Sequence, residues 1–436
     1  MSLIKVAAAG ACMSGRAAFG RLRSAAESPP RRAGALRARA RQAGVLMALL
    51  GLGGSGLGAQ ELTHPQTTFR PVSEYGASQN AVFANTFWWT MGILALVIAL
   101  TLYAAWRFRE RPEAPDPKHI HGNTLLEIAW TLIPAVIVVL IAIPTVRTIF
   151  ENQRDAPQGA LQVEVIGHQW WWEFRYPEQG VVTANQLYLP VGRPIELKLH
   201  SADVIHSFWI PRIGGKRDVN PQARAVEGEA PSFNRIVFTV DSAGLYQGQC
   251  AEYCGDSHAI MRMSVQAVEA GAFDAWVAAM RRGDAAGAEP SPGVVPVSQV
   301  TAGGRAEATS PLDLTAIPSP TGIGSPVQPP VDEAVWAEAG RQVFLSKTCT
   351  ACHAVQGTTA MGAIGPNLTR LGARPHIGAG AAENNLENLV RWIRAPQSVK
   401  PGALMPGAQQ PGGNFPPTGL TEAEIQAIAH YLLSLR

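Results

Sequence analysis

Charge and cysteine are both scarce in this chain of 436 residues, and each shortage excludes a class of protein. Charged residues make up 16% of the sequence against roughly 25% in soluble proteins, so we expect part of the chain to lie in lipid. Hydrophobic residues reach 47% and the net charge is only +3, which excludes disorder throughout. The arginines crowd the extreme N-terminus instead of forming a stripe on a folded face, so we expect no nucleic acid as a partner. Four of the five cysteines form two close pairs, Cys250/Cys254 and Cys349/Cys352, which predicts two cofactor sites rather than a disulfide framework.

Residues 1–59 have the three parts of an export signal. A basic stretch over residues 1–42 precedes a short apolar run, Ala43 to Leu52, and a small-residue exit that ends near Ala59. The apolar run is too short to span a bilayer. The alternative is a poorly ordered tail. If the segment is a signal, the odd Cys12 leaves with it.

Two long uncharged runs, Phe87 to Trp106 and Ile128 to Val146, predict a transmembrane hairpin within residues 60–155. A pair of buried core helices is the alternative. Basic residues in the connecting loop place that loop in the cytoplasm, so we expect the rest of the chain on the periplasmic or outer side of a bacterial inner membrane. The expected helices cover about residues 82–107 and 125–148.

Residues 156–280 have the pattern of a β domain. Apolar and polar side chains alternate over three short segments, Leu161 to Ile166, Ile195 to Leu199 and Arg235 to Val240. Short strands separated by turn residues favour a sandwich or a barrel. A helix from Ala272 to Met280 is expected to follow.

The C-terminal third divides into a linker and a small α-helical domain. Residues 281–330 are dominated by Pro, Gly, Ala, Ser and Thr, which predicts a flexible linker with no apolar cluster to dock it. Residues 331–436 contain an amphipathic helix from Asp332 to Ser346 and a last helix that starts at the capping box Thr421 to Glu424. We therefore expect the C-terminal domain to be tethered, not rigidly packed.

The first cofactor pattern gathers soft donor groups. Cys250, Cys254, His258 and Met261 lie within twelve residues, and His206 precedes them. Thiolate, thioether and imidazole together favour copper over hard cations, and two thiolates can bridge two metal ions, so a dinuclear copper centre is predicted. A Cys₂His₂ zinc site, a disulfide in an exported domain and two ordinary core histidines are the alternatives.

Three segments resemble cytochrome c oxidase subunit II: Gly167 to Trp172, Asp203 to Phe208, and Cys250 to Met261. The two-helix hairpin before them is similar to that family as well, so the resemblance covers about residues 65–280. It implies a cupredoxin-like barrel around the dinuclear copper A centre and a magnesium ion, shared with subunit I, near the Glu252 carboxylate. The copper ligands that it implies are His206, Cys250, Cys254, His258, Met261 and the backbone carbonyl of Glu252.

The resemblance also implies roles for two residues outside the copper ligands. Trp170 is similar to the family's electron-entry tryptophan, although a tryptophan at the base of a strand is often a core or interface residue. Glu127 matches a position at the mouth of a proton pathway into subunit I. Its alternative is a solvated charge at a helix start, which the helix dipole favours.

The second cofactor pattern, Cys349-Thr-Ala-Cys352-His353, is the C-x-x-C-H signature of covalent haem c. Both thiols would add to the haem vinyl groups, and His353 would be an axial ligand. A thioredoxin motif is disfavoured because no βαβ pattern surrounds the cysteines. We expect Met405, on a loop rich in Pro and Gly, as the sixth ligand.

Met361 and His376 are the rivals of Met405 for the iron. Residues 331–436 resemble a class I cytochrome c, with Gly340 and Phe344 on the first helix and Tyr431 on the last at plausible packing positions. His/Met ligation raises the haem potential, which suits an electron carrier.

The whole chain resembles subunit II of the caa-type haem–copper oxidases: a transmembrane hairpin, a cupredoxin-like barrel and an all-α class I cytochrome c domain. The resemblance implies electron transfer from haem c to copper A and on to subunit I, where dioxygen is reduced to water with proton translocation. The implied partners are subunits I and III of the same oxidase, the lipid bilayer, and soluble cytochrome c or an upstream respiratory complex as donor. A copper A nitric oxide reductase subunit and a membrane-anchored electron carrier remain the alternatives.

Overall fold

The computed structural model describes residues 67–110, 121–221, 233–283 and 333–436. The predicted export signal with Cys12, the tip of the basic loop and nearly all of the predicted linker lie outside these residues.

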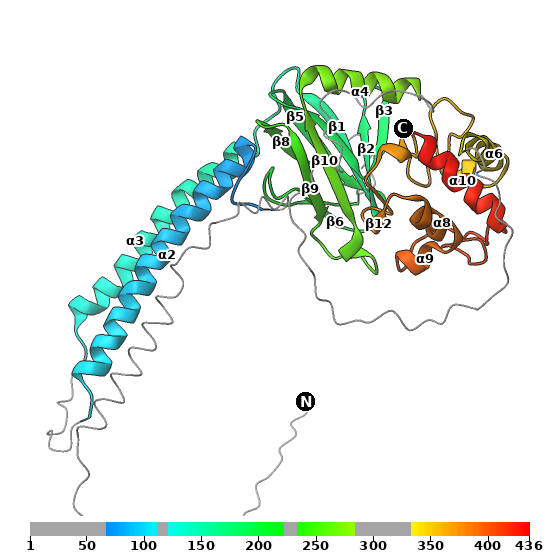
Figure 1. Cartoon of the computed structure of the whole chain (residues 1–436). Helices are drawn as coiled ribbons and strands as arrows, with labels where there is room; N and C mark the ends of the chain where they lie inside the picture. The colour runs from blue at the N-terminus through cyan, green and yellow to red at the C-terminus, as the bar shows by residue number, and fades with distance from the viewer. Residues whose placement is uncertain (1–66, 111–120, 222–232, 284–332) are drawn as a thin grey trace, which may run out of the picture. The chain divides into compact units, whose positions relative to one another are not determined.

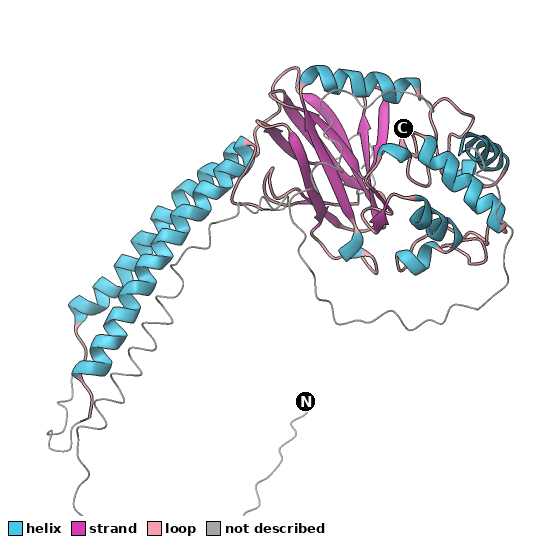
Figure 2. Ribbon diagram, viewed as in Figure 1, coloured by secondary structure: helices cyan, strands magenta, loops and turns pink. Residues whose placement is uncertain are grey.

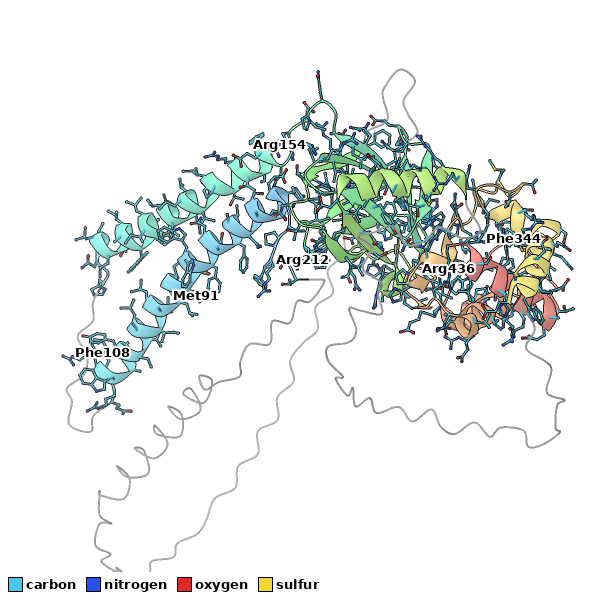
Figure 3. The ribbon with its side chains drawn as sticks, turned by 45° about the horizontal axis from the view of Figure 1, so that its top comes forward. Met91, Phe108, Arg154, Arg212, Phe344 and Arg436 are labelled. Carbon is cyan, nitrogen blue, oxygen red and sulfur yellow. The ribbon has the colours of Figure 1, made fainter. Side chains whose placement is uncertain are left out.

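Two helices form the hairpin, α2 (Glu74–Arg107) and α3 (Thr124–Glu151) (Figure 1). Both are long and apolar enough to cross a membrane, and none of their most apolar window is buried. Their side chains stand out from the ribbons along both helices, as Met91 does on α2 and Phe108 does at its C-cap (Figure 3). An apolar surface that the protein itself does not cover is what a lipid-facing hairpin requires.

Helix α2 begins earlier than the expected residue 82, and this expected bound was wrong. Ser73 caps the helix by accepting a hydrogen bond from the backbone N–H of Gly76 at 3.1 Å. The Ser73 hydroxyl also donates to the carbonyl oxygen of Ile213 at 2.5 Å, which fixes the first turn against the β domain. Hydropathy marks only the apolar part of a helix, so the polar first turns escaped the prediction. Helix α3 likewise extends to Glu151 instead of ending near residue 148.

The β domain has two five-stranded sheets, ordered β3-β2-β1-β5-β8 and β4-β10-β9-β6-β7 (Figure 2). The expected strands are present: β1 and β5 are longer than their alternating segments, and β8 begins and ends one residue earlier than expected. The strand bounds are β1 Leu161–His168, β2 Trp171–Tyr176, β3 Val181–Ala184, β4 Gln186–Pro190, β5 Pro194–Ser201, β6 His206–Trp209, β7 Arg217–Val219, β8 Asn234–Thr239, β9 Gly244–Cys250 and β10 Arg262–Val268.

One hydrophobic core lies within this domain. Trp172 and Phe174 on β2 and Phe208 on β6 are buried, and the rings of Trp172 and Phe208 meet edge to face with centroids 5.3 Å apart. Aromatic contact of this kind adds to the burial of the rings. The cupredoxin-like fold expected from the resemblance is therefore confirmed, and its core supports the strands that carry His206 and Cys250.

Helix α4 (Ala270–Arg282) closes the β domain and runs past the expected end at Met280. Gly283 ends it in the left-handed conformation with φ of 68°, which glycine adopts without steric cost. Trp276 on this helix stacks on Tyr188 of β4, with ring centroids 4.3 Å apart. The helix thus belongs to the β domain and not to the linker.

The C-terminal domain is mainly helical and has its own hydrophobic core. Its longest helices, α6 and α10, cross where Gly340 leaves no room for a side chain: a Cβ there would lie 1.9 Å from the carbonyl oxygen of Ala427. Phe344 and Tyr431 are in ring contact at 5.6 Å, as their expected packing positions required. The capping box at Thr421 and Glu424 is also present. The elements are α6 Glu333–Ser346, α7 Cys349–Cys352, η2 Leu371–Ala373, β11 His376–Ile377, β12 Ala382–Glu383, α8 Leu386–Arg394, α9 Pro396–Val399 and α10 Glu422–Ser434.

Hydrogen bonds join the C-terminal domain to the β domain, a contact that the expectation of a tethered, not rigidly packed domain did not include. The N–H of Arg262 donates to the carbonyl oxygen of Ala379 at 3.0 Å. The Ser257 hydroxyl donates to the carbonyl oxygen of Pro401 at 2.5 Å. These contacts are polar and leave the two hydrophobic cores separate, which is why hydrophobic periodicity gave no sign of them.

Candidate metal centres

The loop between β9 and β10 brings most of the soft donors together. Cys250 ends β9, His258 begins the short helix η1 (His258–Ile260), and Met261 follows it directly. The backbone N–H of Cys250 donates to the carbonyl oxygen of Met261 at 2.9 Å, which closes this loop on itself. His206 enters from the neighbouring strand β6, where Phe208 pairs with Cys250. Strand pairing thus unites residues that are far apart in the sequence.

The two thiols lie at the centre of the group. The Sγ atoms of Cys250 and Cys254 are 3.8 Å apart. Each has an imidazole beside it: His206 Nδ1 is 3.9 Å from the Cys250 sulfur, and His258 Nδ1 is 3.6 Å from the Cys254 sulfur. This symmetric arrangement of two sulfurs flanked by two nitrogens suits a pair of metal ions bridged by thiolates.

Two weaker donors complete the group. Met261 Sδ lies 3.8 Å from the Cys254 sulfur, and the carbonyl oxygen of Glu252 lies 3.2 Å from the Cys250 sulfur. Met261 is fully buried and both cysteines are nearly so. A buried thioether beside thiolates favours soft copper ions over zinc, because protein zinc sites use Cys, His and carboxylate ligands and not methionine. All six donors expected from the resemblance therefore meet, and they fit a dinuclear copper centre.

The two thiols influence each other's protonation. The Cys254 thiol donates to its neighbour, which lowers the pKa of Cys250. The same bond raises the pKa of Cys254, since a second thiolate would be repelled by the first. Bound cations would replace the retained proton, because a metal ion stabilises thiolates outright.

Asp203 fixes the orientation of His206, a role that the sequence analysis did not assign. Its Oδ1 lies 2.8 Å from His206 Nε2. Burial alone would lower the pKa of His206, but the hydrogen bonds to Asp203 and Cys250 outweigh it and leave the pKa raised. A carboxylate on Nε2 leaves Nδ1 turned to the thiols, as metal-binding histidines require. The only sign of this role in the sequence is the short spacing of three residues between Asp203 and His206.

Trp170 lies directly beside the thiol group and is only 7% exposed. Its indole Nε1–H donates to the carbonyl oxygen of Cys254 at 2.9 Å, and the side-chain amide of Gln169 donates to the same oxygen at 2.8 Å. Trp170 is therefore attached to a candidate metal ligand, which distinguishes it from an ordinary core tryptophan.

Glu252 and Glu127 are both exposed and have no cation-binding partner among the described residues. The backbone carbonyl of Glu252 contacts the Cys250 sulfur. Glu127 lies in the first turn of α3, behind the cap Asn123. Among the described residues, Glu252 belongs to no group of metal-binding side chains, and Glu127 has the surroundings of a helix-start charge.

The second centre is built on α7 (Cys349–Cys352), whose single turn contains both cysteines and ends at its cap His353. His353 Nδ1 lies 2.8 Å from the carbonyl oxygen of Pro366. This bond fixes the proton on Nδ1 and leaves Nε2 free to bind iron. Gly365 permits the approach, since a Cβ there would lie 2.7 Å from the imidazole. The residues fit covalent haem c with His353 as an axial ligand.

The candidates for the sixth ligand differ in their surroundings. Met405 is half-buried, and the Gln397 side chain donates to its carbonyl oxygen at 2.9 Å. Met361 is 75% exposed. His376 is also exposed, on β11. Met405 is thus less exposed than either rival, and its assignment as the sixth ligand stays a prediction.

Comparison with known proteins gives three matching families. The family described as cytochrome c oxidase subunit II, transmembrane domain, matches residues 69–148. The periplasmic domain of the same subunit matches residues 179–268. The family described as cytochrome c matches residues 337–436.

Relatives match most of the chain. A protein of Alkalihalophilus pseudofirmus, named cytochrome c oxidase subunit 2, is 33% identical over 353 residues, covering 79% of this chain and 84% of the relative. A protein of the same name from Bacillus subtilis is 30% identical over 411 residues, covering 90% and 97%. Among solved structures, the periplasmic domain of subunit II of cytochrome oxidase from Bradyrhizobium japonicum is 29% identical and aligns with 29% of this chain and 96% of its own length, with a TM-score of 0.26.

Proposed function

Because the chain belongs to the cytochrome c oxidase subunit II family, we propose that it passes electrons from a covalent haem c to a dinuclear copper A centre and on to subunit I of the oxidase. In that subunit, dioxygen is reduced to water with proton translocation. When bound, the copper pair and the haem supply reversible one-electron redox chemistry. The observation that carries the proposal is the contact of the two thiols with each other and with four further donors: two imidazoles, a thioether and a backbone carbonyl.

The copper-side residues act as a rigid cage. Cys250 and Cys254 with His206 and His258 would hold the copper ions, and Met261 and the Glu252 carbonyl would be weaker donors. Each is held by strand pairing or by the closed loop after β9. A cage that already has its donors in contact rearranges little, so the reorganisation that accompanies electron gain or loss stays small.

The haem-side residues belong to the C-terminal domain. Cys349 and Cys352 would form the thioether links to the haem, and His353 through Nε2 and Met405 through its sulfur would bind the iron. A thioether ligand raises the reduction potential, as a donor to copper needs. Since these residues share no member with the copper set, each centre loads independently.

Three further residues connect the chain to its surroundings in this proposal. Trp170 is the electron-entry residue, supported by its hydrogen bond to the carbonyl of Cys254. Glu252 contributes its carboxylate to a magnesium ion shared with subunit I. Glu127 lies at the entrance of a proton pathway in that subunit. The two helices anchor the protein in the bacterial inner membrane, with subunit III as a further neighbour and soluble cytochrome c or an upstream complex as donor.

Metal analysis and spectroscopy of the purified complex test the proposal. We expect two copper ions and one covalent haem for each chain. Cys254→Ser should abolish the copper signal and keep the haem spectrum, whereas Cys352→Ser should weaken haem attachment and keep copper. Zinc in place of copper would contradict the electron-transfer role, and turnover of nitric oxide without dioxygen consumption would assign the chain to a reductase instead.

A further inference from the structure

A buried lysine lies at the junction of the C-terminal domain with the β domain. Lys400 is only 4% exposed, and its ammonium donates to three backbone carbonyl oxygens. Two of them belong to the β domain: Trp170 at 2.6 Å and Ile260 at 3.0 Å. The third is Gly378 of its own domain at 2.7 Å. One side chain therefore ties together three segments of the chain.

The surroundings of Lys400 match its chemistry. An ammonium group has three N–H donors and no acceptor, and three carbonyl oxygens use all of them. Removal from water lowers the pKa of Lys400 to about 7, which reflects the cost of bringing this group into a dry contact. No carboxylate pairs with it among the ion pairs of the described residues. A buried cation without an acidic partner persists only where its hydrogen bonds are worth that cost.

The two residues after Lys400 lie on the same part of the β domain. Pro401 accepts the hydrogen bond from Ser257, next to the candidate copper ligand His258. Gly402 lies against the indole of Trp170, where a Cβ would come within 2.7 Å of the ring carbon Cη2. The φ of Gly402 is +74°, which also favours glycine.

The loop that makes these contacts also carries Met405, the proposed haem ligand. Gln397 holds this loop by donating to the carbonyl oxygens of Ala403 at 3.0 Å and Met405 at 2.9 Å. The contact with the β domain and the haem ligand are thus parts of one braced segment. On the β-domain side of this contact, the Trp170 indole N–H donates to the carbonyl oxygen of Cys254.

We propose that Lys400 is the positioning residue that docks the Met405 loop on Trp170 and so aligns the haem domain with the copper centre. This inference rests on the proposed function. According to this inference, the alignment of the two domains depends on Lys400 and Gly402. The chain's own C-terminal domain covers Trp170. Electrons would then pass between the centres across the Lys400–Gly402 contact.

The test uses the full oxidase with Lys400→Met, a variant of similar length that cannot donate hydrogen bonds. Electron transfer from haem c to copper is followed by time-resolved absorption after rapid reduction of the haem. Loss of about 1.4 kcal/mol of docking free energy would make transfer about tenfold slower. Arg391→Met, which removes an exposed positive charge from the same domain, is the matched control and should leave the rate unchanged.

Gly402→Ala provides a second variant should Lys400→Met fail to fold. Its added Cβ meets the Trp170 ring, so transfer should again be slow while the haem spectrum and both reduction potentials stay unchanged. Gly419→Ala is its control, because Gly419 has a similar φ of +66° but nothing within 4 Å of an added Cβ.

Two results would overturn the inference. Normal transfer in Lys400→Met or in Gly402→Ala, with both centres loaded, would show that docking does not depend on this contact. Slow transfer together with a changed haem spectrum or potential would show that Lys400 acts inside its own domain through Gly378. Either result leaves the proposed function intact, whereas absence of copper or haem from the unmodified protein would contradict the proposed function itself.

Discussion

Replacement of Asp203 by Asn tests whether the copper cage depends on residues that never touch the metal. Asp203 Oδ1 contacts His206 Nε2 at 2.8 Å and accepts the backbone N–H of Val204 at 2.6 Å. Its Oδ2 accepts the backbone N–H of Gln169 at 2.6 Å. Both oxygens are therefore in use. In Asp203→Asn one of them becomes an amino group, which cannot accept, so either His206 or Gln169 loses its acceptor.

The expected loss follows from what the carboxylate does for the imidazole. His206 is fully buried, and Asp203 both selects the tautomer with Nδ1 facing the thiols and increases the basicity of the ring. Loss of such a partner typically lowers metal affinity about 10- to 100-fold, equivalent to about 1.4 to 2.8 kcal/mol. We expect copper affinity to fall within this range while the six donors remain in the chain.

Copper binding is measured by competition with a chelator of known affinity, with the thermal unfolding of the β domain as the measure of correct folding. Asp218→Asn, on an exposed position of β7, removes the same charge from the same domain and should bind copper as the unmodified chain does. Equal copper affinity in Asp203→Asn and Asp218→Asn, with the β domain folded in both, would refute the argument. It would mean that packing alone orients His206.

Three further outcomes are expected. Met405→Ala should lose the sulfur-to-iron absorption band and lower the haem potential in a redox titration, whereas Met361→Ala should change neither, because Met361 is 75% exposed. Gly340→Ala should destabilise the haem domain by about 1–3 kcal/mol in thermal melts, since its Cβ would lie 1.9 Å from a carbonyl oxygen of the facing helix, while Gly271→Ala, with nothing within 4 Å, should not. Burial raises the pKa of Glu173, but the hydrogen bonds from His168 and Arg175 outweigh burial and leave the pKa lowered. The stability that Glu173 contributes should therefore be present above its ordinary pKa near 4.5 and be lost in acid. Glu173→Gln should flatten that part of the stability–pH curve.

The parts of the fold that could be predicted are those with a periodic or local signal. Alternation identified β1, β5 and β8, because one face of each strand is buried. The capping box at Thr421 is a local pattern of side chain and backbone, and it is present as expected. The start of α2 was not predicted, because its cap residue Ser73 is held by a tertiary contact with Ile213 that no local sequence pattern contains.

For the metal centres, residue chemistry and the family resemblance together predicted more ligands than residue chemistry alone. Residue chemistry predicted soft donors and copper, but only the family resemblance selected the Glu252 carbonyl, since a backbone atom has no signature in a sequence. Asp203 and Lys400 stood inside the very segments that carried the prediction and still received no role. A residue that acts by accepting or donating one hydrogen bond across the fold looks, in sequence, like any other polar residue.

The polar character of the interdomain contact explains how a tether and a docked state can coexist. The two hydrophobic cores do not merge, and the contact rests on hydrogen bonds such as those of Lys400 and Ser257. Interfaces of this kind between domains resemble transient protein contacts, so the domains can separate without unfolding. A covalent connection then keeps the local concentration high, and the lysine contact supplies the orientation that concentration alone cannot. Composition predicted the connection because Pro and Gly mark a linker, but it could not predict orientation, which depends on three carbonyl oxygens converging on one ammonium group.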